Sequence, residues 1–230
     1  MSRFMYAIKH AKLRDTRKPA SYFSKYLANQ HNRISSKMAK LDESVGDKRQ
    51  RILVSLTGMC CNMLKAEYSA GASIKDLKNQ LISVLDIVGE YKNMTKDDLL
   101  VLLSLASLLG CGKYITKIVS SNEITIHKDR LLNYIADTCI GNAVWDPMLK
   151  LDTEYKGLDN VFTSDDKIDA MKKYLLGWYS NHSGYAWYNN HNSSEDTYCG
   201  YWSFESAVIV RSLHIDDSTL LKIDIYPDMK

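Results

Sequence analysis

Residues that interrupt helices are scarce in this sequence. Only three of its 230 residues are proline, at positions 19, 147 and 227, so long stretches are free to be helical. The most apolar segment, residues 99–109, is about half as long as a helix that crosses a bilayer, and we interpret it as a buried core helix. The first ten residues hold no apolar run of the length that a secretory signal requires. We therefore expect a cytoplasmic protein without membrane contact.

The five cysteines show no pattern that indicates a disulfide framework or a zinc site. Their number is odd, and none of the spacings is that of a zinc ligand set. Cys60 and Cys61 are adjacent within a helical pattern, which favours small core side chains over a bridge. This cysteine usage is typical of a reducing compartment.

Motifs of catalysis are also missing. The sequence has no HExxH, no CxxC and no GxSxG, and Gly110–Lys113 lacks the glycine spacing of a phosphate loop. His182, His191, Cys199 and Glu205 have spacings that match no known metal-ligand pattern. We predict a protein that is not an enzyme and that holds no metal and no cofactor. The enzymatic alternative is a hydrolase that acts through Glu205 with one of the two histidines.

Charge is divided unevenly between the two ends of the chain. Residues 1–95 carry 17 Lys and Arg against 8 Asp and Glu, a net charge of +9. Residues 96–230 carry 13 against 19, a net charge of −6, so the whole chain has +3. Such a division steers a charged partner to one side of a protein. Basic residues before Pro19, among them Arg3, Lys9 and Arg14, show no periodic arrangement, which favours a solvated basic face over phosphate contact.

Hydrophobic periodicity predicts an all-α fold. Apolar residues recur at helical spacing, and 45% hydrophobic with 25% charged residues is the composition of a globular protein. Ser21, Ser73 and Thr95 are expected N-caps, the last two with an Asp three residues later. Trp145–Pro147 suggests a helix start, and Glu123–Ile126 is the single strand candidate. The predicted helices cover about residues 21–45, 47–70, 74–91, 96–109, 113–119, 128–140, 164–178 and 204–213.

We expect these helices to form one compact multi-helix bundle, with two packed helical lobes as the alternative. The first region, residues 1–95, is basic and holds three long helices. The second region, residues 96–230, is acidic and rich in aromatic residues.

Two motif-like clusters flank a short helix near the C-terminus. Gly200-Tyr201-Trp202-Ser203-Phe204-Glu205 leads into the helix, and Ile215-Asp216-Asp217-Ser218 follows it. Gly200 provides a flexible entry to the helix. The side chains of Asp216, Asp217 and Ser218 compete for nearby backbone groups, which favours a turn. From the residues alone, this segment is a docked helix and a turn.

The same arrangement resembles a known family. GYWSFE, a short apolar helix, IDDS and a Tyr-Pro-Asp tail are similar to the C-terminal signature of PoNi proteins, which are immunity proteins that neutralise a polymorphic-toxin nuclease called PoNe. Leu13–Asp15 before Tyr22-Phe23, and Ala66–Gly71, are further matches, so the resemblance runs from about Leu13 to the end. The family-motif residues, which we interpret as structural, are Arg14, Asp15, Tyr68, Gly71, Gly200, Tyr201, Trp202, Phe204, Glu205, Asp216 and Asp217.

The resemblance implies a protein that binds a cognate toxin tightly and covers its catalytic cleft or substrate path. An acidic surface that mimics nucleic acid would suit a basic nuclease cleft, with ordinary solubility and helix-terminal charge as the alternative explanation. The candidate toxin-binding residues are Asp152, Glu154, Asp159, Asp165, Asp166, Glu195 and Asp196.

Aromatic residues gather in the polar segment 178–202, interleaved with Asn and His. This loop gives the alternative function, a module that binds a small molecule or nucleic acid by stacking. The acidic charge of this half opposes phosphate, and we expect no direct contact with nucleic acid. Glu205 lies close to Trp202 in sequence and would need a partner if it were buried; Arg14, with Asp15, is the partner that we expect.

Overall fold

Helix follows helix along the part of the chain that the structure, a computed structural model, describes, residues 12–230. These residues form ten α-helices and four 3-10 turns, without a β-sheet. None of these helices has the length and the apolar content that a bilayer crossing demands. The α-helices are α1 (Ala20–Asp42), α2 (Gly46–Ser69), α3 (Ile74–Val88), α4 (Lys96–Leu108), α5 (Thr116–Ser121), α6 (Glu123–Lys128), α7 (Arg130–Thr138), α8 (Gly157–Thr163), α9 (Lys167–Asn181) and α10 (Phe204–Ser212).

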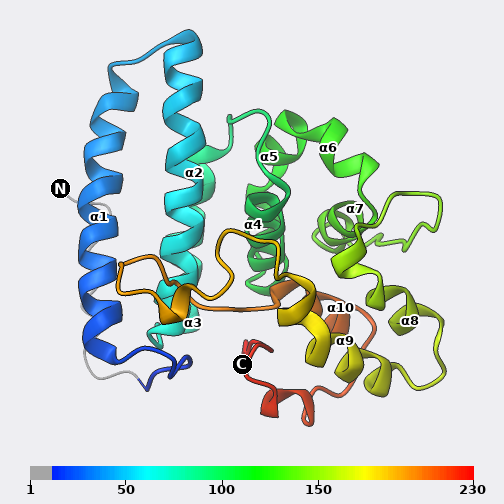
Figure 1. The fold of residues 1–230 in the computed structure, drawn as a ribbon. Helices are drawn as coiled ribbons and strands as arrows, with labels where there is room; N and C mark the ends of the chain where they lie inside the picture. Colours follow the sequence, from blue (N-terminus) through cyan, green and yellow to red (C-terminus); the bar gives the residue numbers. More distant parts are fainter. Residues whose placement is uncertain (1–11) are drawn as a thin grey trace.

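The first two helices form an antiparallel hairpin along one side of the molecule (Figure 1). Helix α2 ends where Gly71 takes a positive φ of 89°, a conformation that glycine adopts without a steric penalty. The Gly71 amide donates to the Tyr68 carbonyl at 3.0 Å and the Ala72 amide to the Glu67 carbonyl at 3.0 Å. This pair of bonds is a Schellman motif, which stops a helix abruptly.

The predicted caps of α3 and α4 are confirmed. Ser73 Oγ accepts a hydrogen bond from the Asp76 amide at 3.1 Å, and Thr95 Oγ1 accepts one from the Asp98 amide at 3.1 Å. Each bond satisfies a backbone donor that a helix start leaves unpaired.

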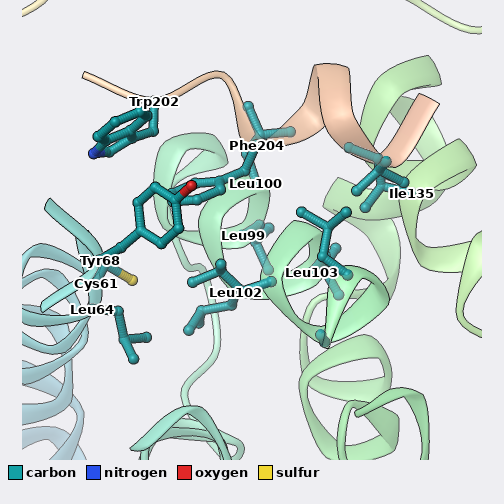
Figure 2. Packing of buried hydrophobic residues seen from close by; sticks show 14 of the residues in the cluster. Cys61, Leu64, Tyr68, Leu99, Leu100, Leu102, Leu103, Ile135, Trp202 and Phe204 are labelled. Atoms are coloured by element: carbon teal, nitrogen blue, oxygen red, sulfur yellow. The ribbon is translucent and has the colours of Figure 1, made fainter. Parts of the chain in front are cut away.

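Helix α4 lies at the centre of the core, packed against α7, α10 and α2 (Figure 1). Leu99, Leu102 and Leu103 have no exposed surface, which confirms the buried helix expected at residues 99–109. Figure 2 shows Tyr68 of α2 directed toward Trp202 and Phe204, beside these leucines. The Tyr68 ring meets both rings edge to face, at centroid distances of 4.8 and 5.4 Å. One continuous hydrophobic cluster therefore joins the two ends of the chain.

Four local predictions were wrong, each for an identifiable reason. Helix α1 begins after Pro19, without a side-chain cap from Ser21. Residues 123–126 are helical, because the Asn122 side chain fixes the preceding turn through the Tyr91 and Ile118 carbonyls. The cap of α9 is Asp166, which bonds the Asp169 amide at 2.9 Å, and not Thr163 or Ser164.

No helix begins at Trp145–Pro147. Arg130 holds this loop through the Pro147 and Leu149 carbonyls, and Trp145 donates to Asp159 at 2.8 Å. The Arg130 side chain therefore pairs two backbone carbonyls of this loop, which in a helix would be paired with backbone amides.

The segment after α9 is the feature that positions the motifs. It runs back across the molecule to α1 and then crosses to α10 (Figure 1). The Tyr22 hydroxyl of α1 donates to the Tyr198 carbonyl at 3.0 Å and accepts from the Tyr198 amide at 2.8 Å. Lys18 also reaches the Ser193 carbonyl at 3.0 Å. These bonds bring residues 198–205 onto the end of α2.

Candidate functional site

The end of α2 is the point where the motifs from both ends of the chain meet. The amides of Arg14 and Asp15 both donate to the Ser69 carbonyl, at 3.0 and 3.2 Å. The Arg14 guanidinium bonds the Tyr68 and Ala72 carbonyls at 3.1 and 2.8 Å and lies 4.5 Å from the centre of the Tyr68 ring. Helix ends leave carbonyls unpaired, and here the chain's N-terminal segment satisfies them.

Gly200 crosses the same helix end from the other side. Its φ is +112°, and a Cβ at this position would lie 2.1 Å from Ser69 Oγ and 2.5 Å from Trp202 Nε1. Ser69 Oγ lies 2.9 Å from the Cys199 carbonyl and accepts from Trp202 Nε1 at 2.8 Å. Only glycine satisfies both the backbone conformation and the close approach.

Glu205 is buried at the start of α10, with 2% of its surface exposed. Its Oε1 accepts hydrogen bonds from Tyr174 at 3.0 Å, Trp178 at 2.7 Å and Ser203 at 2.5 Å. A buried carboxylate with three donors is compensated by its surroundings. It ties α9 to α10.

The expected pairing of Glu205 with Arg14 or Asp15 was wrong. Asp15 instead accepts from the hydroxyl of Tyr198 and from the Arg17 amide, and it pairs with the Arg17 guanidinium at 3.3 Å. The reason is the path of the chain, because residues 12–17 dock at the end of α2 while Glu205 faces α9.

The second motif holds the C-terminal tail. Asp216 accepts from the amide and the hydroxyl of Ser218, both at 3.0 Å, which forms the predicted turn. Asp217 pairs with Lys230 at 2.6 Å. Farther along the tail, the Tyr68 hydroxyl donates to the Asp228 carbonyl at 2.7 Å. The tail is therefore fastened to the same helix end as the other motifs.

Residues 127–229 match the family model for PoNe immunity proteins (PoNi), C-terminal. This region is a PoNi C-terminal domain. It contains the GYWSFE and IDDS motifs of the chain, whereas Arg14, Asp15, Tyr68 and Gly71 lie before it. The structure brings these earlier residues against the PoNi motifs at the end of α2.

A solved structure shares the fold along nearly the whole chain. Protein PA2201 from Pseudomonas aeruginosa aligns with a TM-score of 0.65 at 13% sequence identity. The alignment covers 95% of this chain and 89% of that one. The likeness shows that the fold extends beyond the PoNi domain to the N-terminal helices. A comparison with curated proteins found no match.

The acidic candidate residues are spread over several elements and mostly have partners within the protein. Asp152 pairs with Lys96 and Lys150, each at 2.8 Å, and Asp159 pairs with Arg130 at 2.6 Å. Glu154 accepts from Tyr185, and Asp196 contacts Lys25 at 3.2 Å. Asp166 caps α9. Asp165 and Glu195 are exposed, and neither carboxylate forms an ion pair within residues 12–230.

The aromatic loop packs mainly upon itself. Trp178 stacks on Trp187 at a centroid distance of 5.5 Å, and Tyr179 stacks on Tyr188 at 4.5 Å. The four residues considered as a metal set do not form a metal site, since no group of three His, Cys, Asp or Glu in residues 12–230 has metal-binding geometry. Of the basic N-terminal residues, Arg3 and Lys9 lie outside the described range.

A recess of about 70 Å³ opens beside the PoNi motifs. It lies where the loop meets α2 and α4, and residues from α2 and α4 that the sequence did not single out contribute to its wall. Sequence reasoning had no signal for these residues, because they are more than 75 positions away from the aromatic loop that faces them. Its wall includes Lys65, Asp97, Tyr155, His182, Trp187 and Tyr201.

Proposed function

We propose that this protein is an immunity protein that binds a cognate toxin, a nuclease, and neutralises it by blocking its active site or its substrate path. The observation that carries the proposal is the PoNi C-terminal domain, in a family of immunity proteins. The protein acts in this proposal as a stoichiometric inhibitor, without catalysis of its own.

The architecture supports a rigid inhibitor. The motif residues Tyr68, Trp202, Phe204 and Glu205 are buried and engaged with one another or with the core. Residues fixed in this way stabilise the scaffold and leave toxin recognition to the exposed surface. Preorganised partners lose little conformational freedom on binding, which favours tight association.

The acidic half of the chain suits a basic nuclease cleft. Residues 96–230 carry a net charge of −6, which attracts a cationic partner and speeds encounter. We propose that the contact surface includes Asp165 and Glu195, because both are exposed and neither carboxylate forms an ion pair within residues 12–230. The other candidates already have partners within the protein and would contribute mainly to the long-range electrostatic attraction; they are Asp152, Glu154, Asp159, Asp166 and Asp196.

Co-expression with the toxin encoded by the neighbouring gene tests the proposal. The expected result is rescue of growth and co-purification of the two proteins at a one-to-one ratio. The double variant Asp165→Lys and Glu195→Lys should slow association, while Glu43→Lys, an exposed change in the basic half, serves as the matched control. Cells that die equally fast with and without this protein would contradict the function itself.

The alternative is a module that binds a small molecule or nucleic acid through the loop 178–202. Two pairs of rings already stack on each other, Trp178 on Trp187 and Tyr179 on Tyr188. Fewer ring faces are therefore available to stack on nucleic-acid bases. A fluorescence titration of the purified protein with single-stranded oligonucleotides separates the two functions. Binding that weakens steeply with salt would favour the module over the inhibitor.

A further inference from the structure

Three large apolar side chains are exposed to solvent on the loop between α7 and α8, which extends from one edge of the molecule (Figure 1). Ile140, Val144 and Met148 are 69%, 65% and 89% exposed. The other exposed large apolar side chains in residues 12–230 occur singly along the chain. Single exposed apolar residues are ordinary on a protein surface, whereas a group of them indicates an interaction surface. We call residues 140–148 the apolar loop.

The apolar loop is anchored to the helices on either side of it. Arg130 of α7 donates to the Leu149 carbonyl from Nε and from Nη2, at 3.1 and 2.8 Å. Trp145 donates to Asp159 of α8 at 2.8 Å, and its ring stacks on Phe162 at a centroid distance of 4.2 Å. A loop that is ordered before binding loses little conformational freedom in a complex. The three apolar side chains are therefore presented to solvent by an ordered segment.

Negative charge is in excess around the apolar loop. Residues 130–163, from the start of α7 to the end of α8, carry three Lys and Arg against five Asp and Glu, a net charge of −2. Arg130 pairs with Asp159 at 2.6 Å, whereas Asp137 and Asp146 form no ion pair in the described part of the chain. An apolar centre with an acidic surround is complementary to an apolar pocket flanked by Lys and Arg. The same loop of a second copy would bring like charge against it, which disfavours symmetric self-association.

We propose that the apolar loop docks on the cognate toxin, where Met148 enters an apolar pocket flanked by basic side chains. This inference rests on the proposed function and adds the segment that anchors the contact. Complementary charge speeds encounter, and side chains desolvated at the centre of an interface carry most of the affinity. The loop also lies beside the proposed acidic contact, because Trp145 stacks on Phe162 and Asp165 follows Phe162 by three positions.

The test compares the wild-type full chain with Met148→Gln, Met148→Leu and the control Ile124→Ser, since Ile124 is a single apolar side chain on α6 with 71% exposure. Toxin affinity is measured by calorimetry and neutralisation by co-expression. Met148→Gln keeps the length of the side chain and should weaken binding by about tenfold, whereas Met148→Leu should stay within about threefold and Ile124→Ser should not change. All three variants should melt within about 4 °C of the wild type, because each position is exposed.

Two further variants separate the apolar contact from the charge. The triple variant Ile140→Ser, Val144→Ser and Met148→Ser should weaken toxin binding by on the order of 100-fold, mainly through faster dissociation. Asp146→Asn removes one charge and keeps an oxygen that can accept from the Met148 amide. It should slow association and reduce the salt dependence of the association rate.

Light scattering of the free protein over a range of concentrations identifies what covers the apolar loop. The wild type and the triple variant should have the same mass at every concentration. A larger wild-type species that dissociates in the triple variant would mean that a second copy occupies the loop, which overturns the proposal. Wild-type rescue with an unchanged toxin affinity for the triple variant would also overturn it and leave the function standing. Failure of wild-type rescue overturns both.

Discussion

The absence of a Cβ at Gly200 allows the segment around the GYWSFE motif to pack on the end of α2. The backbone passes over Ser69 in a left-handed conformation, with φ of +112°. A side chain there would be strained by its own dihedral angle and would also collide with the Ser69 hydroxyl and the Trp202 indole. The two hydrogen bonds that Ser69 Oγ makes to this segment depend on that approach.

Gly200→Ala should therefore destabilise the protein by about 3 kcal/mol, a value typical of strain combined with a lost buried contact. Urea unfolding followed by circular dichroism measures the change. Gly58→Ala is the matched control, because a Cβ at Gly58 meets no atom within 4 Å and the position is helical. That control should gain up to about 1 kcal/mol. Equal stability of the two variants would show that the Gly200 conformation is not required.

The sequence identified side chains that need a hydrogen-bond partner, but it did not identify the partners. Glu205 was expected to need a partner if buried, and the structure provides Tyr174, Trp178 and Ser203. The predicted partner, Arg14, is 191 positions away and binds carbonyls at the end of α2 instead. Whether a buried side chain needs a hydrogen bond follows from its own chemistry, whereas the residue that provides the bond depends on the path of the whole chain.

At the scale of elements, Lys96 joins three segments at the start of α4. Its ammonium lies 2.5 Å from Asp129, the cap of α7, and 2.8 Å from Asp152, which precedes the 3-10 turn Thr153–Tyr155. It also lies 4.7 Å from the centre of the Tyr155 ring. Hydrogen bonds from Lys150 and Lys96 lower the pKa of Asp152 below its ordinary value.

Stability should consequently depend on pH through Asp152. A carboxyl whose pKa is lowered by folding stabilises the folded state above its unfolded pKa of about 3.9 and loses that contribution as pH falls through the lower folded value. Asp152→Asn should cost at most about 1 kcal/mol at pH 7, because the pair is partly exposed. Urea unfolding at pH 7 and at pH 2.5 measures the difference. It should shrink at the lower pH, and a gap of equal size at both values would exclude this linkage.

Helices with a strong apolar period and a capping residue were predicted with nearly correct ends, as α3 and α4 show. Errors arose where tertiary bonds replace local ones. Asn122 and Arg130 reach distant carbonyls, which places a helix at 123–128 and a loop at 145–147. A local pattern carries no information about such long-range partners.

At the scale of the whole molecule, the PoNi domain packs against helices that lie outside it. Trp202 and Phe204 pack on Tyr68 of α2, and α10 packs on α4. Helices α2 and α4 lie outside the matched residues 127–229. A single hydrophobic cluster includes residues from α1 to the C-terminal tail. Helix α10 therefore packs in part on an element outside the matched region.

The full chain should unfold in one cooperative transition, and a fragment of residues 127–230 should not fold stably alone. Loss of α2 and α4 would expose apolar side chains that contribute roughly 1.5–3 kcal/mol each when buried. Calorimetry of both chains and hydrogen exchange of the fragment provide the measurements. A sharp transition in the fragment at the temperature of the full chain would instead establish two independent units.

The candidate site was predictable only in part at this scale. The C-terminal motifs could be picked out from sequence because their residues are contiguous. Lys65 and Asp97 could not, because they belong to ordinary helical patterns and reach the recess through the packing of α2 and α4 against a loop about 100 positions later.

The Schellman stop after α2 has a consequence for how such chains can diverge. An α-helix turns by about 100° for each residue, so one inserted or deleted position between Lys65 and Gly71 would rotate Ser69 away from both segments that bond to it. The apex of the α1–α2 hairpin carries no comparable constraint, since Val45 there is 84% exposed. Related sequences should therefore vary in length at the apex while the spacing from Lys65 to Gly71 stays constant.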